Sequence, residues 1–272
     1  MMAGAMMDKD KITAFLDWLA GIQMTAAKYR RAFGAGVLCC GFCILSSPVS
    51  AAGPEPVDPA QMPPLVVNKE KQAPLPDGYQ LKFHEDFEKG KEIPFEPTDN
   101  AAWKIVEQDE NRVYALTKRI SDYKPPQRSP HNISLVKSLD AGSVVIDVQM
   151  QSAMTDYGHR SLCLFFNYED PSHFYYVHFG KEADPHANQI FIVNGADRKA
   201  ISETTTEGTP WDDNWHHARI IRDAETGKIA VYFDDMTKPA MTATDTNFTS
   251  GRVGIGSFDD AGNFDNLKVY TK

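Results

Sequence analysis

Apolar and polar residues alternate in short runs from Tyr79 to the end of this chain, and Gly, Pro, Asn and Asp separate the runs. Alternation with a period of two is typical of strands with one buried face, and turn residues at this spacing are typical of a sandwich or barrel. The pattern predicts an all-β fold with no long helix. The clearest predicted strands cover residues 80–87, 112–117, 143–151, 160–168, 173–180, 189–194, 215–222, 228–233, 252–257 and 263–270.

Two β-hairpins are explicit in the sequence. Residues 169–172 and 223–227 carry the Asp, Pro, Ser and Gly typical of tight turns, and each lies between two predicted strands.

Four of the predicted strands share one division between their two faces, because side chains alternate along a strand. One face of each strand is apolar and is predicted to line the core: Leu162, Leu164, Phe166, Tyr175, Val177, Phe179, Ile146, Val148, Met150, Ile190 and Ile192. The other face mixes polar and aromatic residues: Asp147, Gln149, Gln151, Ser161, Asn167, Tyr176, His178 and Gln189 among Phe165, Phe174 and Phe191.

If these strands are neighbours, the mixed faces form one surface of amides, a carboxylate and aromatic rings. Such groups suit the hydroxyls and apolar CH faces of a sugar. We therefore expect a carbohydrate-binding face, and the alternative is that a loop covers it. Residues flanking these strands extend the predicted site: His159, Arg160, Lys181, His186, Asn188 and Trp211. Trp211 has a second interpretation, as a core tryptophan at a strand entry.

The first 51 residues resemble a secretion signal. Lys28, Arg30 and Arg31 precede an uncharged apolar run at 32–45, and small residues suited to cleavage after Ala51 follow. The run is shorter than the roughly 20 residues that span a bilayer, although an uncleaved anchor is the alternative. We expect a signal at 1–51, with Met24 as a possible true start, a proline-rich linker at 52–76 and one β-sandwich domain at 77–272.

Charge and cysteine content narrow the function further. Residues 1–51 contain five Lys or Arg and three Asp or Glu, so the exported part keeps 23 basic and 34 acidic residues. This acidic balance disfavours nucleic acid and anionic membranes as partners. Three of the four cysteines lie in the signal, which leaves Cys163 without a partner for an internal disulfide. We expect a secreted, periplasmic or cell-surface protein with no stable membrane insertion.

The C-terminal part resembles the concanavalin A-like lectin/glucanase superfamily, in particular laminin-G-like and 3-keto-disaccharide hydrolase-like domains of exported bacterial proteins. The resemblance rests on Trp-His-His-Ala-Arg at 215–219, Val-Tyr-Phe-Asp-Asp at 231–235, Gly-Arg-Val-Gly-Ile-Gly-Ser-Phe-Asp-Asp at 251–260 and Asn-Phe-Asp-Asn-Leu at 263–267. It implies a two-sheet antiparallel jelly roll whose concave sheet meets a poly- or oligosaccharide. It is specific for the fold and weak for activity.

Three functions remain open at this point. The first is binding of a carbohydrate without chemistry. The second is β-elimination or hydrolysis on 3-keto or uronic-acid glycosides, with Tyr176 and His178 as base and acid and with Gln149, Asn188, Gln189 or Arg160 stabilising the developing oxyanion. The third is a structural or adhesive role at the cell surface. The chain lacks the strand with two closely spaced acidic residues on which family 16 glycoside hydrolases rely, which disfavours their two-carboxylate mechanism.

A structural Ca²⁺ is the one cofactor we expect, and no organic cofactor is implied. Sandwiches that resemble this one often join their first and last strands through a hard cation. Asp86 and Asp265 are the predicted ligands, with Glu88 as an alternative to Asp86, because Ca²⁺ prefers carboxylate and carbonyl oxygens.

Overall fold

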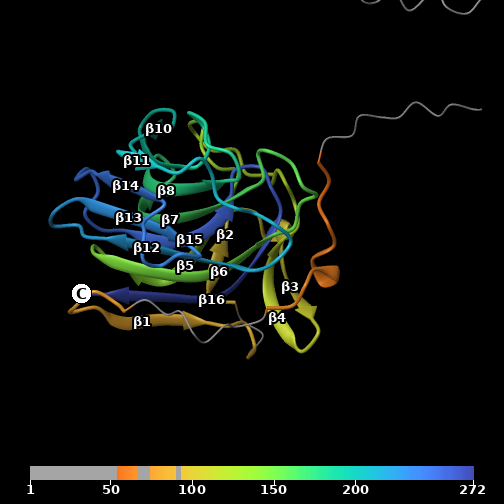
Figure 1. Ribbon diagram of the computed structural model, residues 1–272. Coiled ribbons are helices and arrows are strands. Elements are labelled where there is room, and N and C mark those ends of the chain that lie inside the picture. The colour runs from red at the N-terminus through yellow and green to blue at the C-terminus, as the bar shows by residue number, and fades with distance from the viewer. Residues whose placement is uncertain (1–53, 66–73, 90–92) are drawn as a thin grey trace, which may run out of the picture. The chain divides into compact units, whose positions relative to one another are not determined.

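The computed structural model describes residues 54–65, 74–89 and 93–272, which form two antiparallel β-sheets packed face to face (Figure 1). The nine-stranded sheet has the order β11 (Thr204–Thr205), β14 (Met241–Thr244), β13 (Lys228–Phe233), β12 (His216–Arg222), β6 (Val144–Ser152), β16 (Gly262–Thr271), β4 (Asn111–Leu116) and β3 (Trp103–Gln108), with β1 (Gln80–Glu85) also paired to β16. The seven-stranded sheet has the order β10 (Lys199–Ala200), β9 (Gln189–Asn194), β8 (His173–Gly180), β7 (Ser161–Asp170), β15 (Arg252–Ser257), β5 (Asn132–Asp140) and β2 (Phe95–Pro97).

The predicted fold class, an all-β two-sheet antiparallel sandwich, is confirmed. In the described residues the only helices are the short 3₁₀ turns η1 (Pro59–Gln61) and η2 (Asn100–Ala102). Both predicted hairpins are present. Asp170 accepts a hydrogen bond from the backbone N–H of Ser172 at 2.7 Å, and Asp223 accepts from Glu225 at 3.0 Å, so each turn is fixed by an aspartate side chain.

The core lies between the two sheets, and the side-chain alternation predicts it correctly. The inward positions of β6, β7, β8 and β9 all belong to one buried apolar cluster, together with residues of β12, β13 and β16. Close packing also explains a glycine in β15. A Cβ atom on Gly256 would lie 2.0 Å from the Asn132 carbonyl oxygen of the neighbouring β5, so only glycine allows this approach.

A second apolar cluster covers the outer face of the seven-stranded sheet. It contains the outward residues of β5, β7, β8 and β9, with Tyr123 and Phe258 packed against them. Tyr123 belongs to the loop 117–131, which joins β4 to β5. This loop reaches the turn between β9 and β10, where the Arg128 N–H donates to Asp197 at 2.9 Å and the Arg198 N–H donates to the Arg128 carbonyl at 3.1 Å. The outer face of this sheet is therefore covered.

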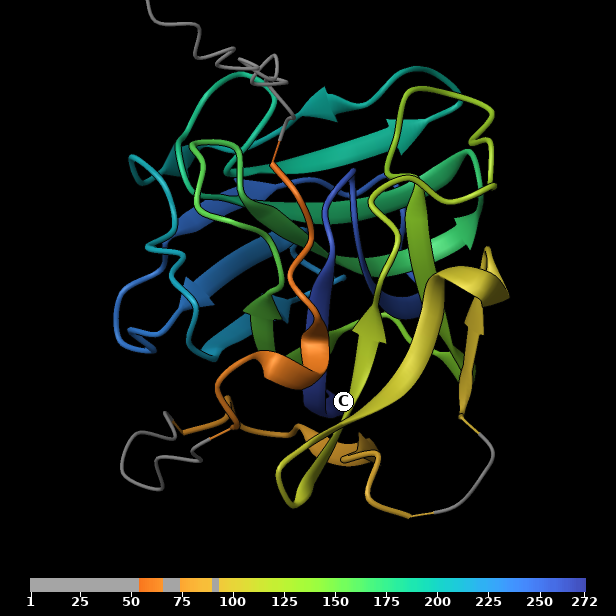
Figure 2. The same ribbon diagram turned by 90° about the vertical axis from the view of Figure 1, so that its right-hand side faces the viewer.

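Residues 54–65, which the sequence predicts as part of an extended linker, pack on the sandwich instead. We call this segment the N-terminal strap; Figure 2 shows it in orange, with its short helical turn next to β3. The Val57 N–H donates to the Ala153 carbonyl at 2.8 Å. Gln108 donates to the Pro59 carbonyl at 2.8 Å, and Gln151 donates to the Pro63 carbonyl at 2.9 Å. Compact packing thus begins before residue 77.

The predicted signal at 1–51 lies outside the described residues. Within the described ranges, no helix is long and apolar enough to cross a membrane.

Candidate functional site

The predicted binding face is divided between the two sheets. β7, β8 and β9 are neighbours in the seven-stranded sheet, but β6 lies in the nine-stranded sheet, between β12 and β16. Asp147 and Gln149 therefore lie on the opposite outer surface from Tyr176 and His178. Both sheets bury one face in a shared core, so their strands show the same alternation, and alternation alone does not assign a strand to a sheet.

Asp147 is occupied by partners within its own sheet. Arg219 donates to both of its carboxylate oxygens, at 2.8 and 2.9 Å, and the His217 imidazole lies 2.9 Å from Oδ1. Although burial opposes ionisation, the hydrogen bonds from His217 and Arg219 hold the pKa of Asp147 below its ordinary value. Gln149 is half-buried beside it on β6. This buried charge pair joins β6 to β12.

Tyr176 and His178, the predicted catalytic pair, lie side by side on the covered outer face of the seven-stranded sheet. Tyr176 is fully buried and His178 is 6% exposed. Above them, the Arg198 guanidinium lies between two rings, 4.7 Å from the centre of Phe191 and 4.2 Å from that of Phe258. Arg198 donates to the Tyr176 hydroxyl at 2.8 Å. This face is therefore covered, as the alternative interpretation of the sequence predicted.

The surroundings of this pair suppress proton exchange near neutral pH. Burial raises the pKa of Tyr176 far above its ordinary value, and burial together with the Arg198 charge lowers the pKa of His178 to about 3. Arg198 lies 3.3 Å from Nδ1 of His178. Because a guanidinium only donates, Nδ1 accepts, and the imidazole proton resides on Nε2.

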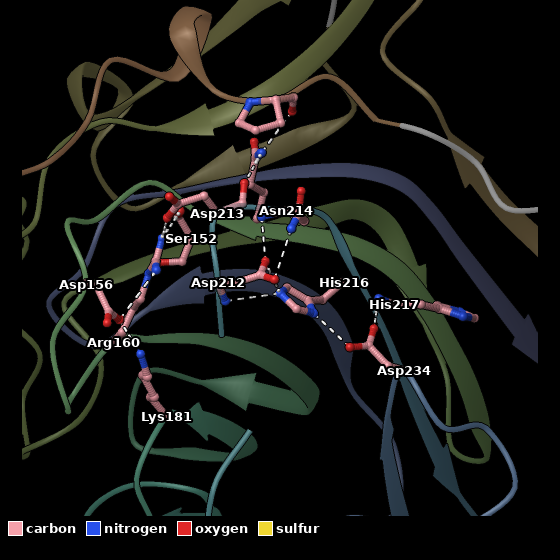
Figure 3. Close-up of polar contacts among 12 residues, drawn as sticks. Ser152, Asp156, Arg160, Lys181, Asp212, Asp213, Asn214, His216, His217 and Asp234 are labelled. Atoms are coloured by element: carbon pink, nitrogen blue, oxygen red, sulfur yellow. Dashed lines mark hydrogen bonds and ion pairs between the residues drawn. The ribbon is translucent and has the colours of Figure 1, made fainter. Parts of the chain in front are cut away.

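A more accessible polar cluster lies where β7 begins and β8 ends (Figure 3). Arg160, only 1% exposed, donates to the Ser152 hydroxyl at 2.9 Å and to the Ser152 carbonyl at 3.1 Å. Its guanidinium also donates to Asp213 at 2.7 Å and lies 3.7 Å from Asp156. Lys181 donates to Asp156. We call Asp156, Arg160, Lys181 and Asp213 the Arg160 cluster.

The loop 182–188 borders this cluster and brings further predicted residues to it. The Lys181 N–H donates to the Arg160 carbonyl at 2.9 Å, which joins the end of β8 to the start of β7. His159 is largely exposed, with its Nδ1 3.9 Å from Asp184. Gln189 donates to the Asp184 carbonyl at 3.3 Å, and the His186 N–H donates to the Asp184 carboxylate at 2.6 Å. His159, Arg160, Lys181, His186 and Gln189 therefore share one end of the sandwich.

Three other predicted binding residues are buried in structural roles. Trp211 is 2% exposed in the main core, and its indole donates to the Phe179 carbonyl at 2.9 Å, so its core interpretation is correct. Asn167 donates to the Ala141 and Gly142 carbonyls, at 2.9 and 3.0 Å. Asn188 donates to the Thr206 carbonyl at 2.9 Å. Both asparagines have positive φ, at 42° and 51°, a conformation that asparagine tolerates. All three side chains are buried against other parts of the sandwich.

The sequence interpretation omitted both carboxylates of the Arg160 cluster. Asp156 and Asp213 lie in loops outside the predicted strands, so their positions did not follow from alternation. A signal was present at the second of them, because Asp212, Asp213 and Asn214 form a run of turn-forming polar residues shortly before β12. Figure 3 shows Asp212 on one side of His216 and Asp234 on the other, at 3.2 and 2.8 Å.

The two predicted calcium ligands are on adjoining parts of the fold, because β1, which precedes Asp86, pairs with β16, which contains Asp265. Asp265 is fully buried and accepts a hydrogen bond from Asn111 at 3.0 Å. Burial raises its pKa to about 7, and the charges of Glu88 and Asp86 add to the increase. The described residues nevertheless contain no group of three or more His, Cys, Asp or Glu side chains arranged to hold a metal. A calcium site stays a prediction.

The sequence matches no known family profile and no curated protein. Among solved structures, a Bacillus subtilis protein with a galectin-like fold is similar at a TM-score of 0.50 and 11% identity, over 71% of this chain and 98% of that one. The carbohydrate-binding module CBM66 of Bacillus subtilis has a TM-score of 0.45 and 16% identity, over 64% and 93% of the two chains. Winged bean acidic lectin has a TM-score of 0.42 and 11% identity, over 70% and 98%. At such identities the likeness shows the fold alone, a lectin-like jelly roll.

Proposed function

We propose that this chain is an exported carbohydrate-binding protein and that it binds its ligand at the Arg160 cluster. A jelly roll hosts many functions, so the fold alone does not carry the proposal. The arrangement of charged groups at the joined ends of β7 and β8 supports it. Export rests on the signal-like pattern at 1–51, which lies outside the described residues.

The observation that carries the proposal is one buried arginine that positions two exposed carboxylates. The Arg160 side chain is 1% exposed, whereas Asp213 is 72% exposed and Asp156 is 66% exposed. An exposed ion pair adds little to stability, and burying a guanidinium is costly unless its hydrogen bonds are made. The arrangement does, however, fix two carboxylates before a ligand arrives, which reduces the entropy lost on binding.

These carboxylates and their neighbours match the chemistry of sugar hydroxyls. A hydroxyl both donates and accepts, so a sugar needs acceptors such as Asp156 and Asp213 next to donors such as Lys181. His159, which is largely exposed, adds a ring nitrogen. Its ring lies 6.5 Å from that of the half-buried Tyr157, so an apolar surface for the CH groups of a sugar is adjacent.

Binding without a chemical step is the form of this function that the geometry favours. The elimination mechanism needs a base and an acid in contact with the ligand. Tyr176 and His178 are buried under Arg198, and their pKa values are displaced away from neutrality. In the Arg160 cluster, the hydrogen bond from Lys181 lowers the pKa of Asp156, which keeps it ionised rather than available as an acid.

The proposal is tested by titrating the exported protein with a panel of neutral oligosaccharides in a calorimeter. Asp213→Asn and Asp156→Asn keep the side-chain shape and remove the charge, so each should weaken binding by about tenfold or more. Asp109→Asn is the matched control, because Asp109 is an exposed aspartate in the β3–β4 turn. If both cluster variants bind with the affinity of the unmodified protein, the ligand is held elsewhere and the proposal is wrong.

A further inference from the structure

A pocket lies where the loop 117–131 meets the turn between β9 and β10. It has a volume of about 340 Å³, and its walls include Lys124, Gln127, Arg128, His131 and Asp197. The volume is within the range of small-ligand pockets. The hydrogen bonds between Arg128 and the 197–198 turn hold its two walls together. None of these residues belongs to the Arg160 cluster.

The pocket concentrates positive charge in an acidic chain. Lys124 and Arg128 are exposed lining residues, and Arg198 directly follows the lining residue Asp197. In the described part of the chain none of these three cations forms an ion pair, and Asp197 uses one carboxylate oxygen to accept the Arg128 N–H. The whole chain has a formal net charge of −9. Unpaired cations collected around one pocket in such a chain attract an anionic ligand.

Buried polar atoms at the same place lack partners. Gln127 Oε1, His131 Nδ1 and Arg198 Nε have no hydrogen-bond partner within the described residues. Buried polar atoms are normally paired, and leaving one unpaired costs free energy, so the lining residues Gln127 and His131 keep unused hydrogen-bonding capacity beside the pocket. The Arg198 guanidinium cannot turn freely to seek another partner, because it is held between Phe191 and Phe258.

We propose that this pocket, the Lys124 pocket, binds the carboxylate of an acidic sugar residue, so that the protein prefers glycans containing uronic acid. Lys124 and Arg128 neutralise the carboxylate, while Gln127 and His131 exchange hydrogen bonds with the hydroxyl groups. That the ligand is a sugar rests on the function proposed above, whereas that it carries a negative charge rests on the residues around the pocket.

The test compares D-glucuronate with D-glucose, which differ only at C6, by ligand-observed NMR titration of the exported protein. We expect glucuronate to bind at least tenfold more tightly, because hydrogen bonds to charged groups are the stronger ones. The Lys124→Gln/Arg128→Gln double variant should lose this preference, and Arg128→Lys should retain part of it. Lys228→Gln, which changes an exposed lysine on β13, should keep it. Circular dichroism of each variant verifies that the sandwich is folded.

Each outcome bears on the pocket separately from the Arg160 cluster. Equal affinity for the two sugars, or a preference that survives in the double variant, overturns the inference. A preference abolished by Asp213→Asn places the carboxylate at the Arg160 cluster and also overturns it. Tighter binding of glucose 6-sulfate than of glucuronate overturns the choice of a carboxylate. If neutral oligosaccharides do not bind but the glucuronate preference depends on Arg128, the pocket is supported and the function proposed for the Arg160 cluster fails.

Discussion

Polar residues that look alike in the sequence occupy very different environments in the folded chain. Side-chain alternation correctly placed Tyr176 and His178 opposite the core positions Tyr175 and Val177. It could not show that the opposite face is itself covered, because Arg198 and Phe258, which contact Tyr176 and His178, come from segments distant in sequence. Alternation specifies a face of a strand, whereas exposure depends on whether distant segments pack on that face.

At the scale of single residues, the lowered pKa of His178 predicts how stability depends on pH. The imidazole titrates near 6.5 in the unfolded chain but near 3 when folded, so between these values the unfolded state binds more protons. The free energy of unfolding should therefore fall as the pH decreases from about 6.5, by up to about 1.4 kcal/mol per pH unit for one proton.

Urea denaturation at several pH values between 4 and 7 measures this contribution. His178→Gln keeps a side-chain acceptor for Arg198 and has no titratable ring, so its stability should depend less on pH than that of the unmodified protein. Parallel stability curves for the two proteins would show that His178 is not buried in its neutral form.

At the scale of whole elements, strands whose apolar residues alternate between turn residues were predictable, even where both faces are buried, as in β8. β8, β9, β13 and β15 begin and end where the sequence predicts. The nine-residue β5 was missed because its alternation is short: it ends where Leu135 and Val136 are adjacent apolar residues, and exposed polar residues follow. β3 was missed for a related reason, since its burial does not follow a period of two.

The N-terminal strap was also unpredictable from composition, because proline content indicates an extended backbone but not whether that backbone packs. Its contacts depend on Gln108 and Gln151, buried amides that face outward from the nine-stranded sheet and donate to strap carbonyls. Trp215 donates to the Pro63 carbonyl at 3.1 Å as well.

Removing the strap should therefore destabilise the sandwich. A chain beginning at residue 77 leaves the Gln108 and Gln151 amides without these acceptors, at about 1–3 kcal/mol for each buried group that stays unpaired. We expect its melting temperature to be about 4 °C or more below that of a chain beginning at residue 52. Differential scanning calorimetry of the two chains makes the comparison, and equal melting temperatures would show that the strap contributes nothing.

At the scale of the molecule, the assignment of strands to sheets determined which predicted site residues could meet. The resemblance of residues 215–267 indicated the fold class correctly, but the position of β6 in the sheet opposite β7–β9 separated Asp147 and Gln149 from the rest. Arg160 and Lys181, which do meet, lie at the ends of the consecutive strands β7 and β8. Consecutive strands joined by short turns are neighbours, so this part of the site followed from local order.

The predicted calcium concerns the closure of the sandwich by β1 and β16. A divalent cation bound by Asp86 and Asp265 would offset the repulsion among Asp86, Glu88 and Asp265, and it would stabilise the fold by about 2.7 kcal/mol at a hundredfold excess over its Kd. We expect EDTA to lower the melting temperature, Ca²⁺ to restore it, and Asp265→Asn to abolish both effects. A melting temperature that EDTA leaves unchanged would argue against the metal.

The central claim is that a carbohydrate binds at the Arg160 cluster, and hydrogen–deuterium exchange tests it most directly. A chain beginning at residue 52 is compared with and without the oligosaccharide that binds best in the calorimetric panel. We predict slower amide exchange in residues 156–160, 181–189 and 211–214, because these segments surround Asp156, Lys181 and Asp213. Protection confined to the outer face of the nine-stranded sheet, or to segments remote from β7 and β8, would contradict the account.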